Sequence, residues 1–148
     1  MPHFGLMNED ALGPMEGPLM RAKLHVRCGR RRLREGKISA GIVTLYDALV
    51  SAMKWYIAGA DRRKLLPITE KDDMTDDRTI FNVLKRSGVI RGVPDFSVID
   101  TIVDQALMGE MPGYDYSGYL ADIETALTQI GVLPFDENEL PPEDPSTF

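Results

Sequence analysis

An arginine-rich stretch, residues 27–37 (RCGRRRLREGK), holds the side chains best suited to bind an anion. It packs five arginines and a lysine into eleven positions, and guanidinium groups recognise carboxylates and phosphates through their planar N–H donors. The arginines spread around most of a helical turn, and no aromatic residue lies among them to stack on a base. We therefore expect a solvated or internally paired helix end, with an acidic protein partner and nucleic acid as alternatives. The candidate binding residues are Arg27, Arg30, Arg31 and Arg34.

A second group with chemical potential is the aspartate cluster DDMTDD, residues 72–77. It resembles the aspartate-rich motif of isoprenoid synthases, and that resemblance implies magnesium and diphosphate binding. Those enzymes are much longer and carry a second such motif on an opposing helix, which this sequence lacks. Carboxylates are also favoured at the start of a helix, so the cluster needs no metal to explain it. We expect no metal or cofactor, and a small metal-dependent enzyme is the weaker alternative. The residues concerned are Asp72, Asp73, Asp76 and Asp77.

Residues for nucleophilic or acid–base catalysis are few. Arg21 and His25 resemble part of the HEPN ribonuclease motif, but only three residues separate them where that motif has four to six. We expect His25 to be a partly buried interface residue and Cys28 to be a small apolar filler. The sequence also has no glycine-rich phosphate loop, nucleophile elbow or zinc-ligand spacing. A non-catalytic function is therefore predicted.

A tyrosine-rich loop, GEMPGYDYSGY at residues 109–119, is a candidate partner surface. Tyrosine suits such surfaces because a large apolar ring carries a polar tip. We single out Tyr114 and Tyr116 for partner binding, and the alternative is that they cap one end of the helical domain.

Helices must position all of these groups, because the apolar residues recur with helical spacing and no convincing strand remains. We predict an all-α, single-domain bundle in which the helix over residues 37–60 is central. Ser97 and Asp100 form a capping-box-like start for the fourth helix. The five predicted helices run from Leu19 to a stop at Gly36, and over residues 37–60, 75–87, 97–108 and 117–130.

Small residues predict a close contact between the first two helices. Residues 28–49 resemble one helix pair of a tetratricopeptide repeat, with Gly29 among the matching positions, although Gly41 stands where that family usually has an alanine. No second copy follows, and a solenoid needs several stacked copies to bury its core. A generic antiparallel helix pair with glycine at the crossing is therefore the prediction.

Two later helices end in a similar way, with Gly88 and Gly131 each followed by apolar residues. An internal duplication could explain this similarity. We favour the simpler explanation that each glycine adopts the left-handed conformation and that the apolar residue after it folds back on the last turn.

The composition indicates a soluble globular chain. Of 148 residues, 43% are hydrophobic and 27% charged, which suits one domain with a core. A single cysteine excludes an internal disulfide, and no apolar run is long enough to span a membrane, so we expect a cytoplasmic protein with no membrane partner. Net charge is uneven: residues 1–37 hold eight Lys/Arg against four Asp/Glu, whereas the remainder of the chain is strongly acidic.

Segments without helical periodicity flank the predicted helical domain of residues 19–133. Residues 1–18 are rich in glycine and proline and predict a flexible arm. Residues 134–148 contain five acidic residues and four prolines, which predicts a disordered tail or an extended surface wrap. Together these features favour a helical interaction or scaffold protein that binds a protein partner or forms a homodimer through its first two helices. A nucleic-acid-associated regulator is the main alternative.

Overall fold

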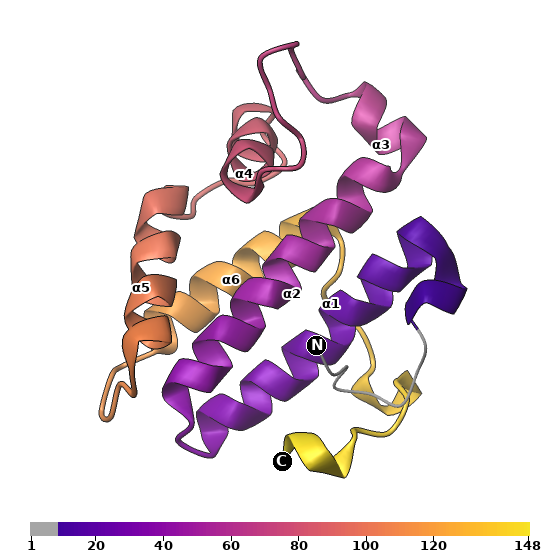
Figure 1. The fold of residues 1–148 in the computed structure, drawn as a ribbon. Helices are drawn as coiled ribbons and strands as arrows, with labels where there is room; N and C mark the ends of the chain where they lie inside the picture. Colours follow the sequence, from indigo (N-terminus) through magenta and orange to yellow (C-terminus); the bar gives the residue numbers. More distant parts are fainter. Residues whose placement is uncertain (1–8) are drawn as a thin grey trace.

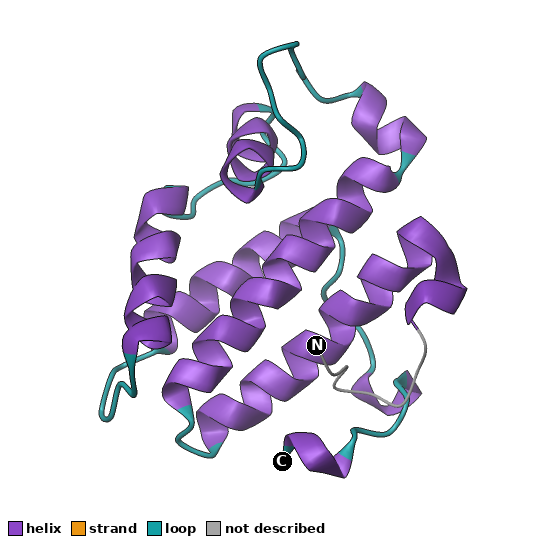
Figure 2. Cartoon of the chain, in the orientation of Figure 1, coloured by secondary structure: helices purple, strands orange, loops and turns teal. Residues whose placement is uncertain are grey.

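The computed structural model describes residues 9–148, and within them the chain folds entirely into helices, turns and loops (Figure 2). The all-α prediction is confirmed, with six α-helices rather than five. The α-helices are α1 (Gly13–Arg34), α2 (Ile38–Ala58), α3 (Ala60–Lys64), α4 (Asp77–Arg86), α5 (Phe96–Met108) and α6 (Ser117–Ile130). Short 3-10 helices are η1 (Glu9–Leu12), η2 (Glu137–Glu139) and η3 (Pro145–Thr147).

Helix α1 begins six residues before the predicted start at Leu19, so part of the predicted arm is helical. Pro14 lies in the first turn, where a proline is tolerated because the missing N–H has no partner in the helix anyway. Pro18 lies further inside α1 and interrupts the backbone hydrogen bonds there. Prolines and glycines obscured the helical pattern in the sequence. Residues 1–8 of the predicted arm lie outside the described part of the chain.

Helix α2 contacts α1, α3, α4, α5 and α6, and α1 runs antiparallel to it on one side (Figure 1). Its sequence is apolar on several flanks, and that composition suits a helix touched from several directions. Its fully buried side chains form a broad stripe that faces the other helices. They include Ile42, Leu45, Ala48, Leu49, Ala52 and Met53.

Close packing of α1 on α2 depends on two glycines. A Cβ atom at Gly29 would lie 2.7 Å from Cγ of Leu45, and one at Gly41 would lie 2.6 Å from Cδ2 of Leu33. Real Cβ atoms do not approach other carbons this closely, so each glycine makes room for a leucine of the other helix. The predicted glycine crossing is confirmed.

The ends of α4 and α6 also follow the sequence. Gly88 and Gly131 have φ angles of 84° and 107°, in the left-handed region that favours glycine. After each glycine the chain folds back: the Val89 amide donates to the Leu84 carbonyl and the Val132 amide to that of Leu127.

The start of α5 differs from the prediction. Asp95 precedes the helix, and its backbone carbonyl accepts a hydrogen bond from the Val98 amide. Ser97 and Asp100 form no capping box, because the helix begins at Phe96 and Ser97 therefore lies inside it; the Asp100 carboxylate pairs with Arg78 of α4 at 3.3 Å. Asp100 thus forms an ion pair between α4 and α5 and not the predicted hydrogen bond at the start of its own helix.

Helix α3 was not predicted, because a segment of five residues is too short to show a helical period. Gly59 separates it from α2 with an extended backbone. The Arg62 side chain then folds back on the end of α2, donates to the carbonyls of Trp55 and Tyr56 at 2.8 and 3.0 Å, and lies 4.1 Å from the Trp55 ring. Across residues 9–148, no helix is both long and apolar enough to cross a membrane.

Candidate functional site

The arginines highlighted by the sequence lie on α1, and the tyrosines lie in the loop between α5 and α6. The arginines and the tyrosines therefore belong to two separate candidate sites. A third polar cluster, between α1 and α2, was not predicted.

Arg31 is the best-connected arginine of the basic stretch. Its guanidinium pairs with Glu35 at 2.7 Å and with Glu143 at 3.3 Å, and it donates to the Thr147 carbonyl at 3.2 Å. The Phe148 ring lies 4.7 Å from its Cζ atom. Three of these four contacts come from the C-terminal segment, which lies beside α1 in Figure 1.

Other arginines of the stretch are also engaged within the chain. Arg30 pairs with Glu124 of α6 at 2.9 Å. Arg32 donates to the Thr44 hydroxyl at 2.9 Å and to the Thr147 carbonyl at 3.5 Å. Arg27 is half-buried and Arg34 is exposed. The structure thus places internal partners on Arg30 and Arg31, two of the four arginines that the sequence offered to phosphate or to a protein.

The acidic tail of residues 134–148 contains the short helices η2 and η3. Asp136 caps η2 and Asp144 caps η3, since each carboxylate accepts from an amide two residues later. Thr147 is buried, and its carbonyl lies between Arg31 and Arg32. Sequence composition could not reveal this arrangement because the arginine partner of Glu143 and of the Thr147 carbonyl lies more than 100 residues away.

Cys28 lies beneath this contact. The thiol is fully buried, and its sulfur lies 3.4 Å from Nη2 of Arg31. Burial raises the pKa of the Cys28 thiol, although Arg32 and Arg31 act in the opposite direction. A protonated, enclosed thiol is a poor nucleophile, in line with the predicted filler role.

The unpredicted polar cluster joins α1 to α2. His25 is fully buried rather than partly buried, and its Nε2 lies 2.6 Å from a carboxylate oxygen of Asp47. Its Nδ1 lies 2.8 Å from the Arg21 carbonyl, while the Arg21 guanidinium reaches the same Asp47 oxygen at 2.6 Å. Burial alone would raise the pKa of Asp47, but His25 and Arg21 outweigh it and hold that pKa below its usual value. A hollow of about 270 Å³ opens beside the cluster, lined by Pro18, Arg21, Asp47, Ser51 and Lys54.

A signal for this cluster existed in the sequence. Arg21 and His25 are four residues apart and so share one face of a helix. Asp47 lies 22 residues after His25, on α2, and only the antiparallel packing of α1 on α2 brings it to that face. The pairing could not be read without the register between the two helices.

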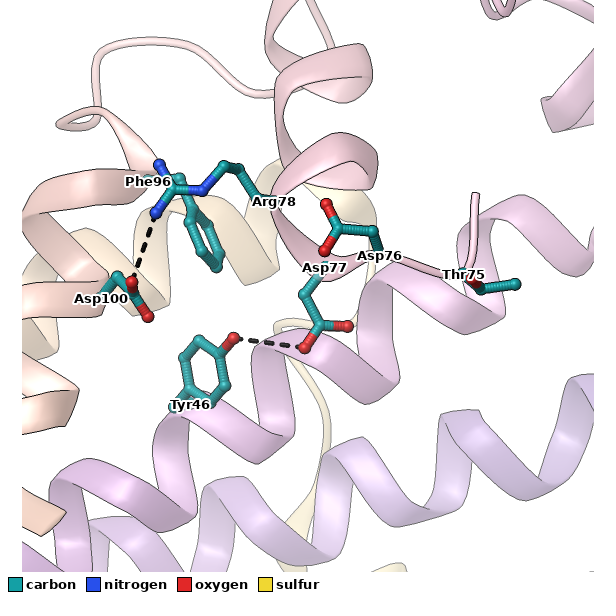
Figure 3. Close-up of a pocket in the computed structure, with 7 residues that line it drawn as sticks. All are labelled: Tyr46, Thr75, Asp76, Asp77, Arg78, Phe96 and Asp100. Atoms are coloured by element: carbon teal, nitrogen blue, oxygen red, sulfur yellow. Dashed lines mark hydrogen bonds and ion pairs between the residues drawn. The ribbon is translucent and has the colours of Figure 1, made fainter. Parts of the chain in front are cut away.

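A polar pocket lies where α2, α4 and α5 meet (Figure 3). Tyr46 of α2 donates its hydroxyl to Asp77 at 3.2 Å. Arg78 pairs with Asp100 and lies 5.2 Å from the centre of the Phe96 ring. Burial, followed by the charge of Asp77, raises the pKa of Tyr46 well above its usual value. The hollow measures about 320 Å³, and Thr75 and Asp76 complete its lining.

The aspartates of the 72–77 cluster serve separate local roles. Asp72 pairs with Arg86 at 2.8 Å, and Asp73 accepts from the amide and hydroxyl of Thr75. Hydrogen bonds from Thr69 and Arg86 lower the pKa of Asp72, and those from Thr75 lower the pKa of Asp73. Throughout residues 9–148, no three acidic, histidine or cysteine side chains converge as a metal ion would require.

Asp76 is the N-cap of α4, and its carboxylate accepts from the Thr79 amide at 3.0 Å. We expect Asp76→Ala to lower the free energy of unfolding by about 1 kcal/mol, because this amide would lose its partner. Asp76→Asn is the matched control, since asparagine caps helices about as well as aspartate. Urea unfolding followed by circular dichroism gives both values. Equal losses in the two variants would contradict a capping role and favour one that needs the carboxylate charge.

The loop between α5 and α6 contains Tyr114 and Tyr116, both half-buried and packed against the apolar core. Directly before this loop, Leu107 and Met108 at the end of α5 are 66% and 89% exposed. The tyrosines stand out in the sequence but these two residues do not, because helical periodicity identifies Met108 only as the end of the helix. Exposure, and not residue type, distinguishes them.

Comparisons with protein-family models, with curated proteins and with solved structures found no match to this chain.

Proposed function

We propose that this chain is a helical interaction protein that binds a protein partner through the end of α5 and the loop after it. The observation that supports this proposal is the exposure of two consecutive large apolar side chains, Leu107 and Met108. Their neighbours on the same helix, Val103 and Ala106, are directed into the core and are almost fully buried. The end of α5 therefore has apolar side chains on both its inner and its outer side.

The surroundings of this pair indicate what kind of partner would fit. Met111, Tyr114 and Tyr116 are half-buried beside the core and add apolar surface in the adjoining loop. Exposed carboxylates of Glu110 and Asp115 lie in the same loop. An apolar centre with an acidic rim is complementary to a partner surface with an apolar centre and basic residues around it.

Helices α1 and α2 expose less apolar surface for self-association than the end of α5 does. Met15, at the start of α1, is 40% exposed, and none of the strongly exposed large apolar residues lies on α2. The proposal therefore places the contact on α5 rather than on α1 and α2. Two copies meeting through α5 would also bring like charges together, which favours a different protein as the partner.

The test combines two substitutions with site-specific photocrosslinking. A photoreactive amino acid at position 108 is expected to crosslink this chain to one partner protein in the cells that make it. The same group at the exposed position 125 of α6 should give no such crosslink. The protein identified in the adduct is then purified. Leu107→Ser with Met108→Ser should weaken its binding about tenfold or more, because two apolar contacts are lost.

Two controls make this test decisive. Thermal unfolding should show that the double variant remains folded, since both side chains point away from the core. Sedimentation of the purified chain over a range of concentrations tests the homodimer directly, and a dimer dissolved by the double substitution would identify a second copy as the partner. Identical adducts from positions 108 and 125, with monomeric behaviour throughout, would contradict the proposal.

A further inference from the structure

We propose that α1 carries a second recognition surface, for an acidic peptide segment with an aromatic side chain, and that the chain's own tail occupies this surface. We define the tail as residues 136–148 and the tail-binding face as Arg31 and Arg32 of α1 with the buried Cys28 between them and the core. The inference is independent of the α5 surface, because the two share no residue.

The contacts made by the tail show what the face recognises. Glu143 supplies a carboxylate, Thr147 a backbone carbonyl and Phe148 an aromatic ring, and all three meet the Arg31 guanidinium. Arginine suits this combination because its N–H donors and its planar face can be used at the same time. Each group is one that any acidic peptide with a nearby aromatic residue could supply.

The tail can leave this face without unfolding the helices. The apolar core of the described chain includes residues up to Phe135 and takes none from the tail. Charged and polar contacts therefore hold the tail, with Thr147 as its buried residue. Segments with few buried apolar contacts open locally at a small fraction of the cost of global unfolding.

Release of the tail would uncover two guanidinium groups next to Arg34 and Lys37, which are already exposed. Arg31 would keep Glu35, and Arg30 would keep Glu124, as partners. The face would thus be moderately and not strongly positive, on a chain of net charge −6. That balance favours an acidic peptide over nucleic acid, whose binding needs many unpaired cations along one face.

A tethered tail competes strongly with any peptide in solution, because a short tether corresponds to an effective concentration in the millimolar range. We therefore expect the unmodified chain to bind an acidic peptide weakly. The tail acts as an internal competitor that sets the affinity for the partner, and weakening the tail should strengthen binding from solution.

The experiment uses the full chain and a fluorescent peptide of residues 136–148 (DENELPPEDPSTF). Glu143→Gln with Phe148→Ala weakens the tail, and this variant should bind the peptide about tenfold more tightly than the unmodified chain, since a charge-assisted contact and a cation–π contact no longer compete. The matched control is Glu137→Gln with Asn138→Ala, two exposed tail positions, and it should bind like the unmodified chain. Fluorescence anisotropy gives the affinities.

Arg31 provides the second part of the test. Adding Arg31→Ala to the weakened-tail variant should abolish the gain in affinity, and Arg31→Lys should restore only part of it because lysine lacks the planar group. Cys28, the single cysteine, gives an independent measurement. Its reaction with a thiol reagent should be faster in the weakened-tail variant and slower again with saturating peptide.

Three results would overturn the inference: equal affinity of the unmodified and weakened-tail chains, binding that does not depend on Arg31, or preferential binding of single-stranded RNA. The last would make the face a nucleic-acid site. Leu107→Ser with Met108→Ser should leave peptide binding unchanged, so failure here is distinguishable from failure of the α5 proposal.

Discussion

Alanine at Gly29 or Gly41 is expected to destabilise the protein by about 1 to 3 kcal/mol, the usual cost of overpacking a core. Each added Cβ would lie within 2.7 Å of a leucine carbon on the opposite helix. Leu33 and Leu45 are almost fully buried, so neither has free space to move into. The two helices would have to separate, and separation would loosen the packing along both.

The direction of this effect distinguishes it from helix propensity. Glycine to alanine in an open helical position stabilises by up to about 1 kcal/mol. Gly118 in α6 has no atom within 4 Å of its would-be Cβ, so Gly118→Ala is the matched control and should be neutral or stabilising. Chemical unfolding of the three variants gives the comparison. Stabilisation at Gly29 and Gly41 equal to that at Gly118 would show that the helices do not cross as described.

Asp47→Asn is expected to lower the free energy of unfolding by about 2 kcal/mol at pH 7, below the cost of breaking a fully buried ion pair because this carboxylate is partly exposed. The loss arises because His25, buried in the interface between α1 and α2, would lose its charged partner. Arg21 would lose the same partner.

The effect should depend on pH in a defined direction. The pKa of Asp47 is lower in the folded chain than in the unfolded one, where it takes the usual value of about 3.9. Its contribution is therefore complete above that value and is lost as the pH falls through the lower folded-state pKa. The difference between the original chain and Asp47→Asn should narrow as the pH is lowered from 5 to 2.

Urea unfolding at several pH values measures this difference. Asp104→Asn, at an exposed position on α5, is the control and should differ from the original chain by less than about 0.5 kcal/mol at each pH. If the ion pair is correct, the difference in unfolding free energy between the original chain and Asp47→Asn should not stay constant down to pH 2. A constant difference would contradict the ion pair, because it would show that the protonated carboxyl stabilises the fold as much as the charged one.

Features that depend on near neighbours in the chain were predictable. Gly88 and Gly131 end their helices as their sequences indicate, because the left-handed conformation and the apolar residue after it belong to one short motif. α6 covers the predicted residues without change. The glycine crossing was also predictable, since close helix packing requires small residues wherever the helices meet.

Features that depend on contacts between residues far apart in the sequence could not be predicted. The tail contacts α1 across more than 100 residues, and its composition could not distinguish a disordered tail from an extended surface wrap. The contact between His25 and Asp47 depends on the register of two antiparallel helices. The exposed pair Leu107 and Met108 depends on which flank of α5 the core covers, and a hydrophobic pattern cannot show which apolar residues are left uncovered.

The short connection between α1 and α2 affects how the chain folds during synthesis. Only residues 35–37 separate these helices, so they can pair as soon as both have left the ribosome, at a small cost in loop entropy. The far side of α2 must then wait for α5 and α6, which are made much later. During that interval the most apolar helix of the chain is half-covered. In the nascent chain, α1 therefore covers one flank of α2 early. The opposite flank of α2 stays exposed until α5 and α6 have been synthesised.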